Sequence, residues 1–348
     1  MEFLSEYGLF IAKTITILLA LMIAVAIVAS SAQKGSKNDH HIEIEKINDR
    51  FDSYKDTLNS AMLSGDALKR QKKSEKKAKK AEQKANKKKR DQLETEVTKR
   101  VFVVGFDGDI KASDTENLRE LVSAILIEAR PEDEVVVKLE SAGGMVHAYG
   151  LAASQLARVK DKNIPLTVCV DHVAASGGYM MACVADKILA APFAIIGSIG
   201  VIAQLPNFHR LLKKTDIDYE MYTAGEYKRT LTMFGENTEK GRQKFVEELE
   251  DTHRLFKDFV SEHRSVVAID DVATGEIWFG RRALENKLVD ALATSDEYLQ
   301  ELSKTVDVFE LKIEHKKSVA EKLGISISTA LEKSFEKGFE LLKTRYFS

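Results

Sequence analysis

Short apolar runs alternate with amphipathic stretches from about residue 100, and this alternation restricts the fold more than any other feature of the 348-residue chain. The apolar runs have the length and β-branched content of buried strands, whereas the stretches between them repeat apolar residues every three or four positions, as one helix face does. Strands separated by such helices are joined by crossovers and lie parallel. The sequence therefore predicts an α/β body with strands at VFVVGF, DEVVVKLES and IPLTVCVD and helices at SDTENLRELVSAILIEA and MVHAYGLAASQLARVK.

Beyond residue 190 the pattern is less regular. The apolar run ILAAPFAIIGSIGVIA precedes YEMYTAGEYK, which we predict to be a strand, and then a long charged helix, TEKGRQKFVEELEDTHRLFKDFVSEHR. The tail is amphipathic between residues 319 and 347. We expect the body to span residues 99–310, and residues 311–348 to form a C-terminal amphipathic extension that packs on the body or on a neighbouring subunit.

The N-terminal segment is apolar almost throughout. From Thr14 to Ala32 no residue is charged, and a helix of that length crosses the hydrocarbon core of a bilayer. We therefore expect residues 1–33 to form a retained, single-pass transmembrane anchor. The alternative is a cleaved signal peptide, which the small residues VASSA favour, although the usual basic n-region is missing. Lys34 and Lys37 follow the span, so the positive-inside rule favours a cytoplasmic body, and the topology stays open.

Residues 34–98 are predicted to form a helical, lysine-rich stalk. Apolar residues recur at the spacing of one helical face at Ile44, Ile47, Phe51, Tyr54, Leu58 and Met62. The basic run 69–90 contains no Pro or Gly, and it is read either as a solvated helix or linker or as a segment that binds anionic lipid headgroups. Because no aromatic residue interleaves with its lysines, we expect no nucleic-acid binding. The net charge of the whole chain is only −2 although this run is strongly basic, so the remainder of the chain is acidic.

The chain offers little for metal or redox chemistry. Its two cysteines, Cys169 and Cys183, are predicted to be buried thiols, and no Cys/His cluster has metal-ligand spacing. No Walker-type glycine loop precedes a Lys-Ser/Thr pair. We therefore expect no metal, no ATP and no other cofactor.

Three glycine-bearing corners follow predicted strands, at LESAGGMV, AASGGYM and IIGSIGV. In a parallel α/β body such corners share the carboxyl edge of the sheet, where functional sites are usually built. Turn geometry accounts for any one corner taken alone, because Gly tolerates positive φ. Together the three corners mark one candidate site.

Ser176, in the second corner, is either a helix N-cap or a nucleophile. The G-x-S-x-G pattern is not matched, since Ala174 stands two residues earlier. His172 is close in sequence, but at a strand end we expect it to point elsewhere. The other possible base is a lysine whose amine burial keeps neutral. Lys228 lies among Tyr, Thr, Gly and Met and is the candidate, against the alternative of an ordinary surface lysine.

Five motifs occur in an order that carries a resemblance to a known family. They are ESAGGMV, DHVAASGGYMMACVADKILA, IIGSIGV, YTAGEYKR and FGRRALENKLVD. On these motifs the stretch from about residue 100 to 295 resembles the SppA/SohB family of Ser-Lys membrane peptidases, the signal peptide peptidase A family. The anchor and the stalk are most like the SohB branch. Ala142 departs from the proline that the family often has in its Gly-Gly loop.

The resemblance implies a fold and a set of roles. The fold is ClpP/crotonase-like, made of repeated ββα units. Ser176 becomes the nucleophile, Lys228 the general base, and Ser198 the residue that orients the lysine amine. The amides of Gly143, Gly144 and Gly177 stabilise the oxyanion.

The resemblance also implies a setting for the activity. Such a protein is a single-pass membrane serine endopeptidase of the bacterial inner membrane, acting on peptides such as remnant signal peptides or damaged membrane-associated proteins. The resemblance implies assembly as a homo-oligomeric ring, in which the Ser and Lys of one site can come from one protomer or from neighbouring protomers. Two alternatives remain open, a crotonase-like acyl-CoA enzyme and a non-catalytic membrane scaffold.

Overall fold

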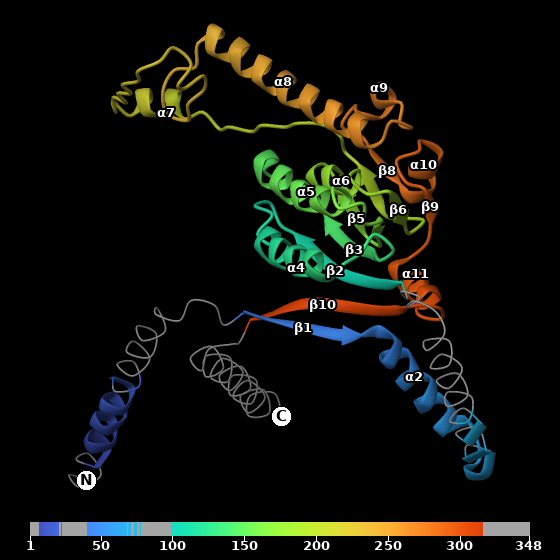
Figure 1. The fold of residues 1–348 in the computed structure, drawn as a ribbon. Helices are drawn as coiled ribbons and strands as arrows, with labels where there is room; N and C mark the ends of the chain where they lie inside the picture. Colours follow the sequence, from blue (N-terminus) through green and yellow to red (C-terminus); the bar gives the residue numbers. More distant parts are fainter. Residues whose placement is uncertain are drawn as a thin grey trace, which may run out of the picture. The chain divides into compact units, whose positions relative to one another are not determined.

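The computed structural model describes residues 7–20, 22, 40–67, 69–70, 73–74, 77 and 99–315 (Figure 1). Most of the basic run and the C-terminal extension from residue 316 lie outside the described residues, as does part of the predicted anchor. The chain divides into two compact units, one of residues 1–43 with 313–348 and one of residues 44–312.

Within the described residues, ten strands form one sheet. Its main path runs in the order β1 (His40–Lys46), β10 (Asp307–His315), β2 (Arg100–Gly108), β3 (Glu134–Ser141), β4 (Leu166–Val170), β6 (Lys187–Ala190) and β9 (Ala291–Leu292). A branch leaves this path through β5 (Val173–Ala175), β7 (Ile195–Gly197) and β8 (Ile277–Phe279). The pairs that β2, β3, β4 and β6 make are parallel, which confirms the predicted α/β body.

The sheet forks at the end of β3. The stretch Val135–Lys138 pairs with β4, whereas Ser141 pairs with Ala174 of β5. β5 then pairs with β7 in parallel, and β7 pairs with β8 in antiparallel fashion. The carboxyl ends of β3, β5 and β7 therefore meet at one place, and the three glycine corners follow these strands.

Helices cover the sheet where the sequence predicts them. The helices that lie against the strands are α4 (Thr115–Glu128), α5 (Val146–Lys160) and the short α6 (Gly177–Ala182), and Figure 1 shows α4 and α5 side by side. Leu118, Leu121, Val122 and Ile125 of α4 are buried at the three- and four-residue steps of one helix face. The long charged helix is α8 (Glu239–His263), and its N-cap Thr238 accepts a hydrogen bond from the Gly241 amide. Shorter helices are α7 (His209–Lys214), α9 (Ile269–Val272), α10 (Gly280–Glu285) and α11 (Ser295–Leu302).

Two predicted elements are wrong. Residues 40–46 form strand β1, and helix α2 (Ile47–Met62) begins only after it, so the predicted helical face does not extend back to Ile44. Ile42 and Ile44 alternate with glutamates, and this period of two is typical of a strand. The three-residue spacing from Ile44 to Ile47 also fits a helix, and for that reason a helix is predicted there from the sequence. The stretch YEMYTAGEYK, which is described in full, forms no strand. Its side chains are all exposed, and no strand of the sheet pairs with it.

The core joins segments from both ends of the unit of residues 44–312. Ile47 of α2 is fully buried in a cluster with Val101, Val136, Leu299 and Val308. Burial of side chains of this size stabilises the fold by about 1.5–3 kcal/mol each. β10 belongs to this arrangement and extends to residue 315, beyond the predicted end of the body at residue 310.

Both cysteines are buried free thiols, as predicted. Burial raises the pKa of Cys169 to about 12, and it does the same for Cys183. Neither thiol carries a thiolate at neutral pH, so both serve as small apolar side chains.

Residues 7–20 and 22 of the predicted anchor are helical, and the rest of residues 1–33 lie outside the described part. Among the described residues, no helix combines the length and the apolar character that crossing a bilayer requires.

Candidate active site

Ser176 lies in a strained turn between β5 and α6. Its φ is +52° and its ψ is −119°, a conformation that residues other than glycine rarely adopt. Backbone bonds hold the turn: the Ser176 amide donates to the Gly197 carbonyl at 2.7 Å, and the Met180 amide donates to the Ser176 carbonyl at 3.0 Å. Strain of this kind costs about 1–3 kcal/mol and persists where the surrounding structure over-determines it.

The side chain of Ser176 does not cap the helix that follows. Ser176 occupies the N-cap position of α6, but its hydroxyl makes no capping hydrogen bond. The residue is half-buried, between wholly buried Ala174 and Gly177. The interpretation of Ser176 as an ordinary cap therefore loses its physical basis, and the hydroxyl is left for other chemistry.

The first glycine corner packs directly against this turn. Gly143 has a φ of +90°, and a Cβ placed on it would lie 2.7 Å from the Cβ of Ser176 and 2.7 Å from the Gly177 nitrogen. Only a residue without a side chain fits here. The amide of Gly143 donates to the Ser141 hydroxyl at 3.0 Å, and the Met145 amide donates to the Ile110 carbonyl at 2.9 Å.

The third corner lies in register with the second. Ala175 of β5 pairs with Gly197 of β7, so Ser176 and Ser198 are the next residues on two paired strands. Ser198 is half-buried and also has a positive φ, +50°, and its amide donates to the Glu276 carbonyl at 2.7 Å. The structure thus brings Ser176, Ser198 and Gly143 together at one edge of the sheet.

Lys228 lies on a different kind of segment. We name residues 201–238 the arm; it connects β7 to α8, and every side chain from residue 213 to 229 is exposed. The Lys228 amide donates to the Gly225 carbonyl at 3.2 Å. Among the described residues, its ammonium has no hydrogen-bond or ion-pair partner, so the single chain does not join Lys228 to Ser176. Neighbouring Glu226 pairs with Lys240 of α8 at 2.5 Å.

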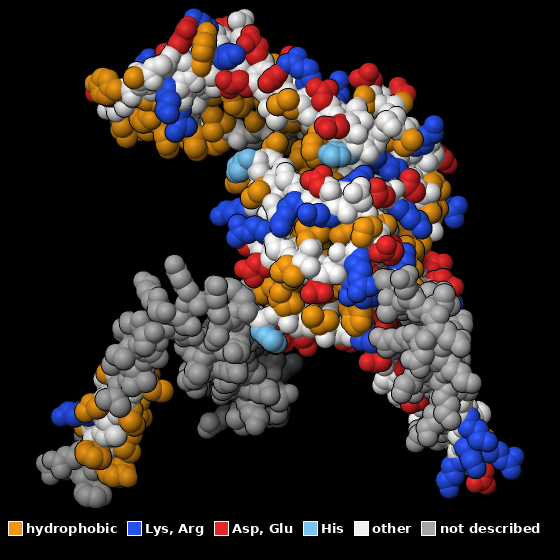
Figure 2. Space-filling model, viewed as in Figure 1, with side chains coloured by type: hydrophobic (Ala, Val, Ile, Leu, Met, Phe, Trp, Pro, Cys, Tyr) orange, Lys and Arg blue, Asp and Glu red, His pale blue; other side chains and the backbone are white. Residues whose placement is uncertain are grey.

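The arm carries many exposed apolar side chains (Figure 2). Tyr222 is 87% exposed and Ile202 is 79% exposed, and both lie in the arm. The exposed apolar residues of the arm also include Leu205, Phe208, Leu211, Ile217, Tyr219, Met221 and Tyr227. An apolar surface of this extent is typical of a segment that packs against another protein surface.

His172 is exposed, at the end of the short link between β4 and β5, and no hydrogen bond among the described residues joins it to Ser176. This agrees with the expectation that it points elsewhere. Sequence reasoning missed two other side chains, Ser141 and Tyr149. They lie beneath the Gly143 loop and are hydrogen-bonded to each other at 2.5 Å. Ser141 lies in LESAGGMV and Tyr149 in MVHAYGLAASQLARVK, but their contact is tertiary and leaves no periodic signal.

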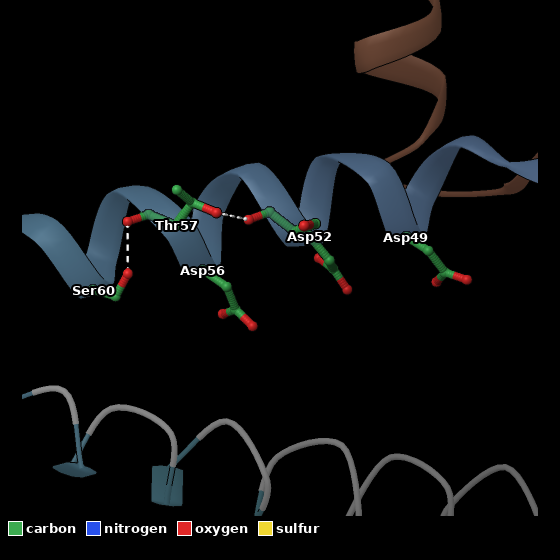
Figure 3. Close-up of a pocket in the computed structure, with 6 residues that line it drawn as sticks. Asp49, Asp52, Asp56, Thr57 and Ser60 are labelled. Carbon is green, nitrogen blue, oxygen red and sulfur yellow. Dashed lines mark hydrogen bonds between the residues drawn. The ribbon is translucent and has the colours of Figure 1, made fainter.

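A groove lies apart from this site on α2. It is lined by Asp49, Asp52, Ser53, Asp56, Thr57 and Ser60, and Figure 3 shows the three carboxylates along one side of the helix. The hydroxyls of Thr57 and Ser60 donate to backbone carbonyls of the same helix. Among the described residues, no group of three or more His, Cys, Asp or Glu side chains lies close enough to hold a metal ion. The groove is a solvated helix face.

Comparison with known proteins gives consistent matches along the chain. Residues 2–156 match Peptidase family S49 N-terminal, and residues 158–309 match Peptidase family S49. A probable protease SohB of Haemophilus influenzae is 53% identical over 326 residues, which cover 93% of this chain and 92% of that protein. A probable protease SohB of Buchnera aphidicola is 47% identical, with 97% and 98% covered. A putative signal peptide peptidase SppA of Enterococcus faecium is 30% identical over 49% of this chain and 50% of that protein.

Among solved structures, a mutant of the 1510-N membrane-bound stomatin-specific protease in complex with a substrate peptide is similar with a TM-score of 0.42. It is 14% identical to this chain and covers 65% of it, and 98% of the solved chain is matched.

Proposed function

Because this chain belongs to peptidase family S49, we propose that it is a membrane-anchored serine endopeptidase with Ser176 as nucleophile and Lys228 as general base. The observation that carries the proposal is the strained turn at Ser176, which keeps the hydroxyl out of helix capping and holds it beside Gly143. Sharp strand-to-helix turns of this kind present nucleophiles in unrelated hydrolases. The glycines beside the turn let a substrate carbonyl approach Ser176.

The proposed chemistry is acyl transfer in two steps. Lys228, as a neutral amine, takes the hydroxyl proton while the Ser176 oxygen attacks the peptide carbonyl, and the resulting ammonium then protonates the leaving amine. Water next attacks the acyl-enzyme ester, its proton passes to Lys228, and Ser176 departs with a proton. Ser198, which follows the residue paired with Ala175, would accept a hydrogen bond from the lysine amine and orient it.

The oxyanion needs amide donors beside Ser176. Gly177 is the first residue of α6, so its amide has no acceptor within the helix. We propose that Gly177 and Gly144 supply the main donors. The amide of Gly143 already donates to Ser141, so Gly143 contributes chiefly the space that its missing side chain leaves for Ser176.

We further propose that the site is completed by a second copy of the chain in a homo-oligomeric ring. Two features support this: Lys228 is exposed in the single chain, and the arm that carries it exposes apolar side chains such as Tyr222. Packing of the arm on a neighbour would bury these side chains and would bring an amine toward a half-buried hydroxyl. Burial of Lys228 there would favour the neutral amine. The ββα units around β3 and β5 would form the ClpP/crotonase-like core of each protomer.

The same family and the N-terminal sequence support the substrate class and location that we propose. The uncharged run from Thr14 to Ala32 supports a single-pass anchor in the bacterial inner membrane, and the basic run 69–90 supports contact with anionic lipid. The substrates would be peptides or unfolded polypeptides near that membrane, such as remnant signal peptides or damaged membrane-associated proteins.

The test uses two inactive variants of the full chain. We expect Ser176→Ala and Lys228→Ala each to abolish peptide hydrolysis, and Ser176→Ala also to abolish labelling by a fluorophosphonate probe. Mixing the two variants, with exchange of subunits, should restore about a quarter of wild-type activity if Ser and Lys come from different protomers of a closed ring. A mixture that stays inactive would place both groups in one protomer. Unchanged hydrolysis by Ser176→Ala would rule out the serine mechanism.

A further inference from the structure

A chain of hydrogen bonds runs beneath the Gly143 loop and links it to the sheet. The Gly143 amide donates to the Ser141 Oγ at 3.0 Å, Ser141 Oγ lies 2.5 Å from the Tyr149 hydroxyl, and that hydroxyl donates to the Asp109 carbonyl at 2.7 Å. The four groups come from the loop, from the end of β3, from α5 and from the connection after β2. One chain of bonds therefore ties the loop to β3, to α5 and to the connection after β2.

The direction of these bonds is determined by their ends. An amide only donates and a carbonyl only accepts, so the Gly143 proton points to Ser141 and the Tyr149 proton points to Asp109. The Ser141 hydroxyl then donates to Tyr149 at 2.5 Å in preference to its second acceptor, the Gly108 carbonyl at 3.3 Å. Hydrogen bonds aligned in this way polarise and strengthen one another. Among the described residues, Ser141 is the side chain that is hydrogen-bonded to both the loop amide and the phenol, and loss of either hydroxyl breaks the chain.

Tyr149 also contacts the other wall of the site. A Cβ placed on Gly177 would lie 2.4 Å from the Cγ of Tyr149, so the ring packs against the backbone of the residue after Ser176. The hydroxyl of the same side chain supports the Gly143 loop through Ser141. Tyr149 therefore contacts the Ser176 turn with its ring, and it supports the Gly143 loop through the bond between its hydroxyl and Ser141.

Gly108 leaves room for this arrangement. A Cβ placed on Gly108 would lie 2.5 Å from both the Ser141 Oγ and the Tyr149 hydroxyl. Tyr149 itself is wholly buried, and burial is the main cause that raises its pKa, so the phenol stays protonated and keeps its donor role at neutral pH.

We propose that Tyr149, together with Ser141, is a positioning residue that sets the spacing between the Gly143 loop and the Ser176 turn and so holds the oxyanion amides in place. This inference rests on the proposed peptidase function. Because Tyr149 is buried, it acts through the loop and the turn, without touching substrate. Tyr149 therefore contributes to stabilising the transition state, in which negative charge develops on the substrate oxygen that the amides hydrogen-bond.

The experiment compares two buried tyrosines in the full-length protein. Tyr149→Phe keeps the ring against Gly177 and removes the hydroxyl that accepts from Ser141. Tyr179→Phe is the matched control, since Tyr179 is also wholly buried and its hydroxyl also donates to a backbone carbonyl, that of Leu288 at 2.9 Å. Both variants lose one buried hydroxyl, so similar changes in melting temperature are expected.

Kinetics separate positioning from stability. We expect Tyr149→Phe to lower kcat for a peptide substrate by roughly 10- to 100-fold with KM changed by less than about twofold. Tyr179→Phe should stay within about twofold of the wild type in both constants. The affinity of a peptide aldehyde, which forms a tetrahedral adduct on the serine, should fall in parallel with kcat in Tyr149→Phe alone.

Ser141→Ala breaks the same chain at its other link. It should resemble Tyr149→Phe, and the double variant should be no worse than either single variant, because one broken link already frees the loop. If Tyr149→Phe retains the kcat of Tyr179→Phe, or if the losses of the two single variants simply multiply, the inference is wrong. Ser176→Ala in the same assay separates this from failure of the proposed function, since activity that survives in Ser176→Ala would remove the serine mechanism itself.

Discussion

Ser176 follows a strand that is paired on both sides, whereas Lys228 lies on an arm in which every side chain from residue 213 to 229 is exposed. The first region is held by register, by backbone hydrogen bonds and by the close contact of Gly143. The second is tied to itself by bonds from Asn207 and by ring contacts of Phe208 with Phe234, but it exposes apolar side chains. The fold of one chain therefore completes the nucleophile side of the proposed site, and we infer that the base side is completed by assembly.

Two glycines with similar backbones give the sharpest test of this difference. φ is +90° at Gly143 and +97° at Gly225 in the arm, but only Gly143 is crowded, since a Cβ on Gly225 has nothing within 4 Å. We expect Gly143→Ala to lower kcat/KM for peptide hydrolysis by more than about 100-fold, because the new methyl group displaces the turn or the loop. Gly225→Ala should lose no more than about fivefold, since it adds only backbone strain. Equal losses in the two variants would break the comparison.

The exposed apolar surface of the arm gives the next largest effect. Replacing both Ile202 and Tyr222 with Ser should leave the unfolding of the single chain unchanged but weaken assembly, because these side chains are already exposed in it. We expect activity to fall about tenfold at low protein concentration and to recover as the concentration rises. Sedimentation and activity over a dilution series measure both. Ile127→Ser is the control, because Ile127 is 80% exposed on α4 of the body. A double variant that behaves like this control would argue against docking of the arm.

A buried ion pair distinguishes the body from the arm in stability. Burial acts to raise the pKa of Asp133, but hydrogen bonds from Arg100 and from the Arg130 amide outweigh it and hold the pKa below its usual value. The lowered pKa adds stability that is present above the unfolded-state value of about 4 and is lost as the pH falls through the folded-state value. We expect Asp133→Asn to destabilise the fold by about 2–4 kcal/mol at pH 7 and to flatten the loss of stability in acid.

Urea unfolding between pH 3 and pH 7 measures this effect. The control is Glu226→Gln in the arm, which removes one partner of the exposed pair with Lys240 and should leave unfolding nearly unchanged. Equal losses of stability in the two variants would contradict the contrast between the buried carboxylate of the body and the exposed carboxylate of the arm.

The smallest expected effect concerns the thiols of the body. Since burial raises the pKa values of Cys169 and Cys183 to about 12, iodoacetamide at pH 8 should modify neither cysteine in the folded protein, and activity should not change. A cysteine introduced in the arm by Tyr222→Cys should react readily in dilute, dissociated protein, and more slowly once the arm packs on a neighbour. Mass spectrometry of the intact protein reads both outcomes, and fast labelling of Cys169 would show that the core opens.

The sequence predicts those parts of the fold whose periodic pattern is local. The strands β2, β3 and β4 and the helices α4, α5 and α8 were all expected, because burial imposes a period of two or a run of apolar residues on strands and a period near 3.6 on helices. β1 was read as helix because Ile44, Ile47 and Phe51 fit a helical step as well as a strand followed by a helix. β10 carries charged residues, Glu310 and Lys312, within a strand, and its partner β2 lies about 200 residues earlier, so nothing local marks it.

The same distinction applies to the site. Three glycine corners after parallel strands predicted a common edge, and the structure places Gly143 and Ser198 beside Ser176. The link from Ser141 to Tyr149 could not be predicted, because it depends on how α5 packs over β3. The strand expected before Lys228 was wrong, since its apolar residues lack any neighbouring strand within the described chain.

The handedness of the turn at Ser176 also limits which nucleophile the position accepts. At a φ of +52° a β-branched residue is strongly disfavoured, and the Cβ of residue 176 already lies close to Gly143. Threonine would add a methyl group there, whereas cysteine would replace one atom with another. The backbone at position 176 therefore accommodates serine or cysteine but disfavours threonine. Backbone geometry, apart from any difference in reactivity, restricts which nucleophile this position can carry.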